Sequence, residues 1–412
     1  MCEKQVVLSD VSLRAEKWHN RAAKFALIFF CIALWHNTIV WIGFLILVVA
    51  WVLDGGHRRL EETIKEPLAL AILILCGFLA LGMLWGDSPE AGRLRWKKYF
   101  LLLAFIPFLS LLNKVRLPWA IGALLVGYFS VLIVGVYQWT VVEVQGIPPL
   151  KMNYLSFSAM IGTGYIVTLC LTITSNNIKI NLLGWGVALF LLFIQFNQNA
   201  RGFLLATLLT SVFLILLCYK TEIRKLLGMT VVLVVVVVTF AYGSDSFQKR
   251  LIEARDDIKL SQQDDRYDNN LGYRLAVWDV GLHGIAQRPW FGHGTGTPER
   301  YFDETIVTYK GGIYQHLSTY DETRHYHNDW IEIGMHIGLL GLLAFAFFLW
   351  SWFKTFKNHQ LPLLGAALVC FIFLAGMTDA FILYSRIPAL MLVITAILIC
   401  WQRENRPVSR EL

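Results

Sequence analysis

The residues best suited to chemistry stand together where the longest polar stretch of the chain ends, in the line Arg324-His325-Tyr326-His327-Asn328-Asp329-Trp330-Ile331-Glu332. An imidazole titrates near about pH 6.5, so His327 is the candidate base that would take a proton from a reacting group. Asn328 and Asp329 follow it and are expected to orient its ring. The alternative is that His327 only caps or hydrogen-bonds the helix that begins here.

Arginines stand at the expected starts of other helices on the same side, at Arg201, Arg274 and Arg386. A helix N-terminus carries a partial positive charge, so a cation there costs roughly 0.3–1 kcal/mol. The arrangement is explained if an anion lies between these groups, because a guanidinium fork binds two phosphate oxygens at once. Taken singly, Arg201 can be a snorkelling interface residue, Arg274 a solvated one, and Arg386 the partner of Asp379.

A metal site at His325 and His327 is disfavoured. Residues two apart point the same way only in an extended segment, and no cysteine or carboxylate stands near them at an established zinc spacing. We therefore expect neither a metal nor a cofactor. The run Gly292-His293-Gly294-Thr295-Gly296 lacks the features of a phosphate-binding loop, and we expect it to let the backbone pass close to the membrane or to a ligand.

These groups would be carried by an all-α polytopic membrane protein. Apolar residues make up 56% of the chain and charged residues 16%, against roughly a quarter charged in soluble domains. A membrane-crossing helix needs about 20 apolar residues, and we expect about twelve such helices. The apolar blocks lie at roughly 21–37, 38–53, 68–86, 99–113, 118–139, 155–175, 180–197, 202–219, 226–243, 331–353, 361–383 and 387–401. The first is expected to be a retained helix, because no small-residue cleavage site follows it. All cysteines but Cys2 lie in these blocks, which argues against disulfides.

Lysine and arginine in the short loops favour both termini in the cytoplasm. The chain then divides into an N-terminal bundle of about nine helices (1–243), a long outer loop with amphipathic helices (244–330), and about three C-terminal helices with a short cytoplasmic tail (331–412). In the loop, helices are expected from Ser246 to Glu253 and from Asn270 to Arg288, the second with Leu275, Trp278 and Leu282 on one face. The net charge of +7 comes mostly from loops, so it indicates topology rather than a nucleic-acid partner.

Four of these stretches, in order, resemble the motifs of the O-antigen ligases and of the wider O-antigen ligase/polymerase superfamily. They are Gln198-Asn199-Ala200-Arg201-Gly202-Phe203-Leu204, Gly272-Tyr273-Arg274-Leu275-Ala276-Val277-Trp278, Arg288-Pro289-Trp290-Phe291-Gly292-His293-Gly294 and His325-Tyr326-His327-Asn328-Asp329-Trp330. The segment from Asp379 to Pro388 is similar to a further ligase stretch. The chain departs from the common pattern mainly in a charged insert, Asp256 to Asp268.

The resemblance implies a GT-C-like, metal-independent, inverting glycosyltransferase with no cofactor. It would move an assembled polysaccharide from undecaprenyl diphosphate to the lipid A core oligosaccharide, at the periplasmic face of the inner membrane. Arg201 and Arg274 would bind the diphosphate, with Arg386 as a third contact, and His327 would activate the acceptor hydroxyl. Arg324, His325 and Asp379 would complete the substrate-binding set.

Three other functions compete. The sister polymerase shares the fold, the carrier and the arginines. A protein O-oligosaccharyltransferase belongs to the same superfamily. A transporter of lipid-linked sugars would be expected to carry ionisable groups in mid-membrane, where this chain offers only Asp379. The run Arg93, Arg95, Lys97 and Lys98 would face outwards, either as a solvated loop or to hold phosphates of the acceptor.

Overall fold

The computed structural model describes residues 2–87, 89–244, 247–249, 251–253, 255, 267, 270–319 and 325–405. Within these ranges the elements are helical, apart from an isolated bridge between Ile147 and Met152. The longer helices are α1 (Cys2–Ala33), α2 (Ile39–Leu53), α4 (Pro67–Leu81), α5 (Pro89–Phe100), α6 (Phe105–Leu111), α7 (Leu117–Thr140), α8 (Tyr154–Thr174), α9 (Ile178–Phe196), α10 (Arg201–Tyr219), α11 (Ile223–Tyr242), α13 (Asn270–Gln287), α14 (Pro298–Thr305), α15 (Asp329–Asn358), α16 (Pro362–Thr378) and α17 (Arg386–Asn405). Short helices join them: η1 (Gly56–Arg59), α3 (Leu60–Ile64), η2 (Gly82–Leu84), η3 (Leu101–Ala104), η4 (Pro148–Leu150), η5 (Tyr309–Gly312), η6 (Gln315–Thr319) and η7 (Phe381–Tyr384).

The chain is a polytopic α-helical membrane protein. Each expected apolar block contains helix, and eight helices in the described part are long and apolar enough to cross a membrane. A ninth span results if α2 and the helices that follow it, bent by 83°, count as one. The shorter α16 is also apolar. The number of crossings, expected to be about twelve, therefore stays a prediction.

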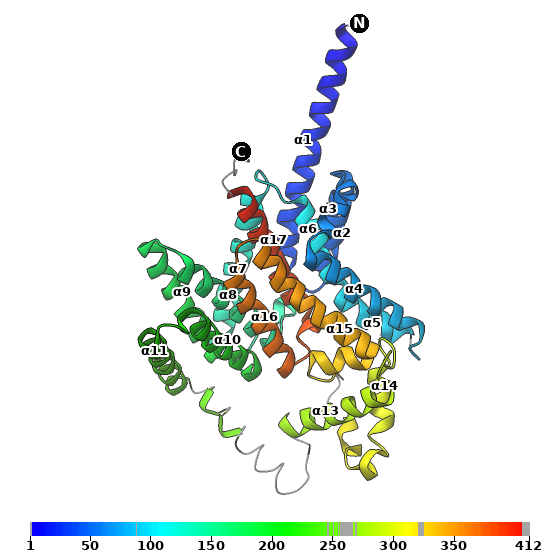
Figure 1. The fold of residues 1–412 in the computed structure, drawn as a ribbon, viewed down its shortest axis with the longest axis vertical. Helices are drawn as coiled ribbons and strands as arrows, with labels where there is room; N and C mark the ends of the chain where they lie inside the picture. The colour runs from blue at the N-terminus through cyan, green and yellow to red at the C-terminus, as the bar shows by residue number, and fades with distance from the viewer. Residues whose placement is uncertain are drawn as a thin grey trace.

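The two ends of the bundle differ (Figure 1). The start of α1 and the end of α17 point out of one end, and α13 and α14 lie at the other, which we call the loop end. Helix α15 packs against α4 and α16, and α16 also packs against α10. Helix α11 lies at the edge of the bundle and has no buried residue. The starts of α10 and α15 and the end of α16 thus meet at the loop end.

A break in α15 shapes this end of the bundle. Ile337 and Gly338 leave helical geometry, with φ values of −136° and 60°. The break turns the first two turns of α15 back on the rest, so that the Trp330 ring lies 5.0 Å from the ring of Phe345. Fifteen residues of straight helix would separate them by about 22 Å. The backbone groups that the break exposes need other partners, since a membrane offers none.

The glycine-rich run at 292–296 supplies those partners. The amides of His293 and Gly294 donate to the carbonyls of Met335 and His336, at 2.8 and 2.9 Å, and Leu339 donates to the carbonyl of Pro289 at 2.7 Å. A Cβ on Gly294 would stand 2.4 Å from backbone of the segment after α4, so only glycine fits there. The expected close passage is therefore against the protein's own backbone.

The two helices predicted in the outer loop agree with the structure to different extents. Helix α13 (Asn270–Gln287) confirms the second, and of the three residues predicted to share a face, Trp278 packs against the buried cluster at the loop end. Leu275 and Leu282 are 44% and 58% exposed, and the residues that pack inward are Tyr273, Ala276, Val277 and Val280. Small residues face α15 because the helices approach closely: a Cβ on Gly281 would meet Ile331 at 2.4 Å. In the first, residues 247–249 and 251–253 are helical, and Ser246 and most of the 256–268 insert lie outside the described residues.

Candidate active site at the loop end

A buried carboxylate lies at the centre of the candidate site. Asp379, which is 2% exposed, follows the last residue of α16. Its Oδ1 accepts from the Nε2 of His325 at 3.0 Å, from the Nδ1 of His327 at 3.1 Å and from the Ala380 amide at 2.9 Å. Its Oδ2 accepts from the hydroxyl of Tyr384 at 2.8 Å. Two histidines of one segment are thus brought to a carboxylate more than fifty residues away in the sequence.

The turn after α16 is fixed by a second buried acid. The side chain of Asp329, which is fully buried, accepts from the Ile382 amide at 3.1 Å. Glycine is required opposite, because a Cβ on Gly376 would stand 2.5 Å from an Asp329 oxygen. The start of α15 therefore holds η7 in place, and η7 carries Tyr384 to Asp379.

His327 is presented by an unusual backbone conformation. Its φ is +47°, in the left-handed region, which costs a non-glycine residue roughly 1–2 kcal/mol. Asn328 then caps α15, since its side chain accepts from the Trp330 and Ile331 amides at 2.9 and 3.3 Å. The His325 ring lies 4.1 Å from the His327 ring, and Tyr273 of α13 meets His327 edge-on. The predicted helix cap thus exists, but Asn328 provides it rather than His327.

The surroundings keep Asp379 ionised. Burial alone would raise the pKa of its carboxyl group, but the hydrogen bonds and charges of His325 and His327 outweigh burial and hold this pKa well below its ordinary value. Burial and the neighbouring carboxylate raise the pKa of Tyr384 well above its ordinary value, so its hydroxyl stays protonated and donates. A fixed negative charge beside two imidazoles stabilises whichever of them takes up a proton.

Two of the expected arginines lie beside this cluster. Nη1 of Arg274 donates to the carbonyl of Thr378 at 2.7 Å, directly before Asp379. The start of α10 packs on the same residue, because a Cβ on Gly202 would stand 2.7 Å from its hydroxyl oxygen. The neighbouring Arg201, with a side chain 35% exposed, pairs with Glu253 at 2.9 Å. Thr378 is thus where the starts of α10 and α13 meet the end of α16.

Arg386 is held in a different way. It is buried and donates to the carbonyls of Trp35 at 3.0 Å, Leu150 at 3.4 Å and Lys151 at 2.8 Å. These contacts contradict the alternative that Arg386 pairs with Asp379. The side chain instead joins the start of α17 to the segments around Trp35 and around Leu150. Whether it also meets a substrate stays a prediction. Arg324 lies outside the described residues.

Donor atoms of His325, His327 and Asp379 lie within 4.8 Å of one another, close enough to surround a metal ion. The objection from helical spacing was wrong, because both histidines precede α15. The same atoms hydrogen-bond with one another, so the geometry fits either a hydrogen-bonded triad or three ligands of an ion such as zinc.

The comparison with known families bears on this site. Residues 186–346 match the family model described as O-Antigen ligase. The chain contains a domain of the O-antigen ligase family. This domain includes Arg201, Arg274, His325 and His327, whereas Asp379 and Arg386 lie beyond the matched residues. The family comprises glycosyltransferase-like enzymes, both ligases and polymerases, and the match does not separate the two.

The comparison with an individual protein says less about function than the family match does. This chain is 25% identical over 155 residues to a protein of Haemophilus influenzae that is described as uncharacterized. The similarity covers 36% of this chain and 38% of the relative, so the chain spans well under half of that protein's length. It therefore transfers no activity.

The loop end also holds a buried charge cluster that sequence reasoning missed. Glu332 accepts from the Tyr326 amide at 3.0 Å and lies 3.3 Å from His336 and 3.8 Å from Arg95. The spacing of Glu332 and His336, four residues apart on a helix, could have revealed this pair. Arg95 is 8% exposed and also faces Glu299 at 3.6 Å. The expectation that Arg95 faces outwards was therefore wrong, because the buried carboxylate of Glu332 on α15 and the more exposed one of Glu299 on α14 both attract its guanidinium. The neighbouring Arg93, Lys97 and Lys98 are exposed.

Proposed function

We propose that this chain is an O-antigen ligase. It transfers an assembled polysaccharide from undecaprenyl diphosphate to a sugar of the lipid A core oligosaccharide, at the periplasmic face of the inner membrane. The observation that carries the proposal is the buried Asp379–His327 pair standing beside two arginines at the starts of α10 and α13. A base and an anion site side by side are what transfer from a diphosphate to a hydroxyl requires.

The chemistry divides between the base and the arginines. The Nδ1–H of His327 donates to Asp379, so Nε2 carries the lone pair that takes the proton of the acceptor hydroxyl. As that oxygen bonds to the anomeric carbon, the bond from this carbon to the diphosphate oxygen breaks and its electron pair leaves with the diphosphate. Arg201 and Arg274 offset the charge that grows there, so no general acid is needed. Direct displacement inverts the anomeric centre.

Asp379 has a supporting role in this scheme. It fixes the tautomer and orientation of His327, and its charge stabilises the imidazolium that forms. His325 contacts the same oxygen and keeps the carboxylate in place. The scheme uses no metal and no cofactor.

The orientation of the chain fits this location. The start of α1 and the end of α17 point out of the same end of the bundle, as expected if both termini are cytoplasmic (Figure 1). The candidate site is at the opposite end, which we assign to the periplasm, and a GT-C-like arrangement would place the diphosphate there. A transporter would be expected to carry its ionisable groups in mid-membrane, whereas Asp379 lies at the end of α16, beyond its last helical turn.

The experiment is a gel of lipopolysaccharide from a host that lacks this chain, complemented with the natural chain or with the His327→Ala variant. We expect loss of all glycan on the lipid A core in the variant, with long polymer still on the carrier. The matched control is His57→Ala, an exposed histidine at the opposite end of the bundle. Cores that carry a single repeat unit would indicate the polymerase instead. Full rescue by His327→Ala would remove His327 from the mechanism.

A further inference from the structure

The segment that carries the two site histidines is held from both of its sides. His325 and His327 contact Asp379 on one side. Tyr326, which stands between them, contacts the other side: it is 2% exposed, and its hydroxyl donates to the carbonyl of Pro298, the first residue of α14, at 3.1 Å. The position of the histidine rings therefore depends on what fixes Tyr326 as well as on Asp379.

The backbone of Tyr326 is fixed by the carboxylate of Glu332. Oε2 of Glu332 accepts from the Tyr326 amide at 3.0 Å, and the glutamate is only 1% exposed. Glu332 lies in the first turn of α15, so its side chain reaches back past the Asn328 cap to the segment that precedes the helix. Because a buried amide without an acceptor is unfavourable, this hydrogen bond restricts where Tyr326 can lie.

The backbone conformation next to this hydrogen bond is strained. His327 has a φ of +47°, in the left-handed region that residues other than glycine disfavour. Such a conformation persists only where the surrounding structure imposes it. Glu332 holds the residue before His327, and Asn328 caps the helix that begins after it. The backbone is thus fixed on both sides of the strained residue.

The carboxylate of Glu332 is itself oriented by its second oxygen. Oε1 lies 3.8 Å from Nη1 of Arg95 on α5 and 3.3 Å from Nε2 of His336, one turn further along α15. His336 is held in turn, since its Nδ1 accepts from the Gly296 amide at 3.4 Å. Oε1 therefore sets the orientation of the carboxylate, and Oε2 accepts from Tyr326.

We infer that Glu332 is a positioning residue for the transfer reaction. Through the Tyr326 amide it holds His327 in the left-handed conformation in which Nδ1 of the imidazole faces Asp379. The inference rests on the proposed function, because Glu332 acts through His327 and not on substrate. Without this oxygen, the 325–327 segment relaxes towards ordinary backbone geometry, the imidazole loses its single tautomer, and transfer slows.

Two substitutions separate the hydrogen bond from the charge. Glu332→Gln and Glu332→Met both remove the charge beside Arg95, but only glutamine keeps an oxygen that can accept from the Tyr326 amide. Since misplacing a catalytic group by about 1 Å can slow a reaction about 100-fold, Glu332→Met should slow transfer about tenfold to 100-fold, and Glu332→Gln by less than about threefold.

A backbone variant tests the same hydrogen bond without changing a side chain. The α-hydroxy acid analogue of tyrosine, incorporated at position 326, replaces the amide N–H by an ester oxygen and so removes the donor to Glu332. It should reproduce the effect of Glu332→Met on transfer. It also decides the question if Glu332→Met does not fold.

The tautomer of His327 gives a readout that a purely structural role would not change. Nitrogen NMR of the full chain, labelled with ¹⁵N-histidine in lipid bilayers, distinguishes protonated from unprotonated ring nitrogens. The spectrum is recorded at about pH 9, well above the ordinary imidazole pKa of about 6.5, and the signals missing from His327→Ala identify this ring. We expect protonated Nδ1 in the natural chain and in Glu332→Gln, and a mixture of tautomers in Glu332→Met and in the ester variant.

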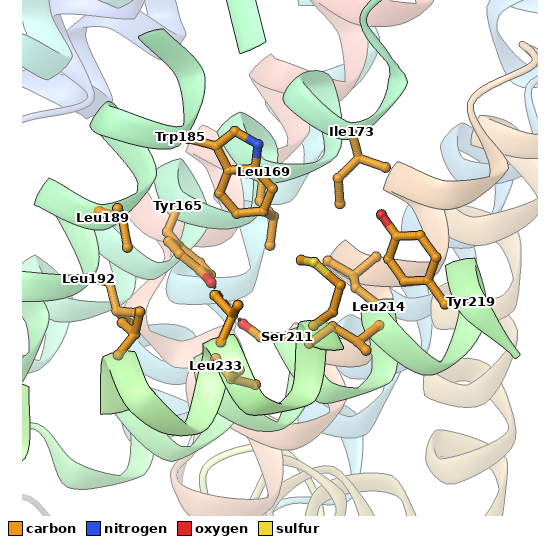
Figure 2. Close-up of a pocket in the computed structure, with 14 residues that line it drawn as sticks. Tyr165, Leu169, Ile173, Trp185, Leu189, Leu192, Ser211, Leu214, Tyr219 and Leu233 are labelled. Carbon is orange, nitrogen blue, oxygen red and sulfur yellow. Dashed lines mark hydrogen bonds between the residues drawn. The ribbon is translucent and has the colours of Figure 1, made fainter. Parts of the chain in front are cut away.

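A buried hydrogen bond elsewhere in the bundle gives the matched control. In a cavity of about 210 Å³ between α8, α9, α10 and α11, the hydroxyls of Tyr165 and Ser211 lie 3.0 Å apart (Figure 2). Ser211 is about 15 Å along α10 from Arg201. Tyr165→Phe removes this hydrogen bond, so it should lower Tm but leave the tautomer of His327 and the rate of transfer unchanged.

The outcomes separate this inference from the proposed function. A single tautomer with protonated Nδ1 in Glu332→Met or in the ester variant would overturn the inference. Equal losses of transfer in Glu332→Met and Glu332→Gln would also overturn it, since the charge rather than the hydrogen bond would then be needed. A mixture of tautomers with undiminished transfer would instead refute His327 as the base and leave the positioning of His327 by Glu332 standing.

Discussion

Replacing Asp379 by asparagine should slow transfer without removing the substrate site. The side chain keeps its shape and an oxygen that can accept from His327, but it loses the negative charge. The proposed mechanism begins from a neutral His327. The charge of Asp379 matters most when His327 takes the proton of the acceptor, because only then do opposite charges stand 3.1 Å apart. The loss therefore falls on the transition state, and we expect kcat to decrease while KM changes little.

The structure bounds the magnitude. Unit charges at the distance between Nδ1 of His327 and Oδ1 of Asp379 attract by about 5 kcal/mol at an effective dielectric constant of about 20. A hydrogen bond to a charged group is worth about 1.5–3 kcal/mol, which sets the lower bound. With about 1.4 kcal/mol for each factor of ten, Asp379→Asn should slow transfer between about tenfold and several thousand-fold.

The assay is single-turnover transfer by the purified full chain, from lipid-linked polysaccharide to lipid A core. Asp279→Asn is the matched control, since Asp279 pairs with Lys310 at 2.6 Å and Tyr314 at 2.9 Å and contacts neither histidine in the structure. A change of less than threefold in Asp379→Asn would refute a role for its charge. An increase in KM at unchanged kcat would mean that Asp379 only helps to bind substrate.

Three further perturbations follow from the packing and the charges. Gly202→Ala brings a Cβ to 2.7 Å from the Thr378 hydroxyl, so α10 must shift. The rate of transfer should drop about tenfold to 100-fold and should recover when Thr378→Ala is added. Failure to recover would contradict this account. Arg95→Met leaves the buried Glu332 without its arginine and should lower the free energy of unfolding in detergent by about 3–5 kcal/mol. Arg93 is exposed, so Arg93→Met should change this free energy by less than about 0.5 kcal/mol. Equal effects of the two substitutions would be inconsistent with a buried pair. Because the folded pKa of Asp379 lies below its unfolded value near about 3.9, the stability that it contributes is complete above that pH and is lost only as pH falls through the folded pKa. The difference in Tm between the natural chain and Asp379→Asn should therefore show no contribution from titration of this carboxyl between pH 5 and 8. The infrared band of the Asp379 carboxyl, isolated as the difference between the natural chain and Asp379→Asn, should show no titration midpoint in this range, and a midpoint there in the natural chain would exclude a lowered pKa.

The sequence revealed the site best where a residue type contradicts its local setting. Arg201 at a helix start and Arg274 near another are electrostatically misplaced. In the structure Arg274 donates to Thr378, and Gly202, the neighbour of Arg201, packs on the same residue. The helix that follows His327 was predictable from the apolar block at 331–353, although its cap, Asn328, was not. These signals are local, and a single helix end is enough to produce them.

What the sequence could not reveal depends on distant segments. Nothing near Asp379 predicts that it takes hydrogen bonds from two histidines and Tyr384, because these meet only after α15 and α16 pack. Nor could the sequence show which residues of α13 pack inward, because close approach to α15 favours small residues such as Gly281. The break at Gly338 was hidden because the glycine run that stabilises it stands more than forty residues earlier.

The contacts of Arg386 have a consequence for the order of assembly. The three residues whose carbonyls accept from this guanidinium, Trp35, Leu150 and Lys151, are all synthesised well before Arg386. Until α17 inserts, these carbonyls lack the Arg386 guanidinium as a donor, and the early segments are not joined through it. Insertion of α17 thus joins segments that were synthesised much earlier. A chain shortened by its final helix should be recognised and degraded by membrane proteases, even though every residue from Arg201 to Asp379 is present.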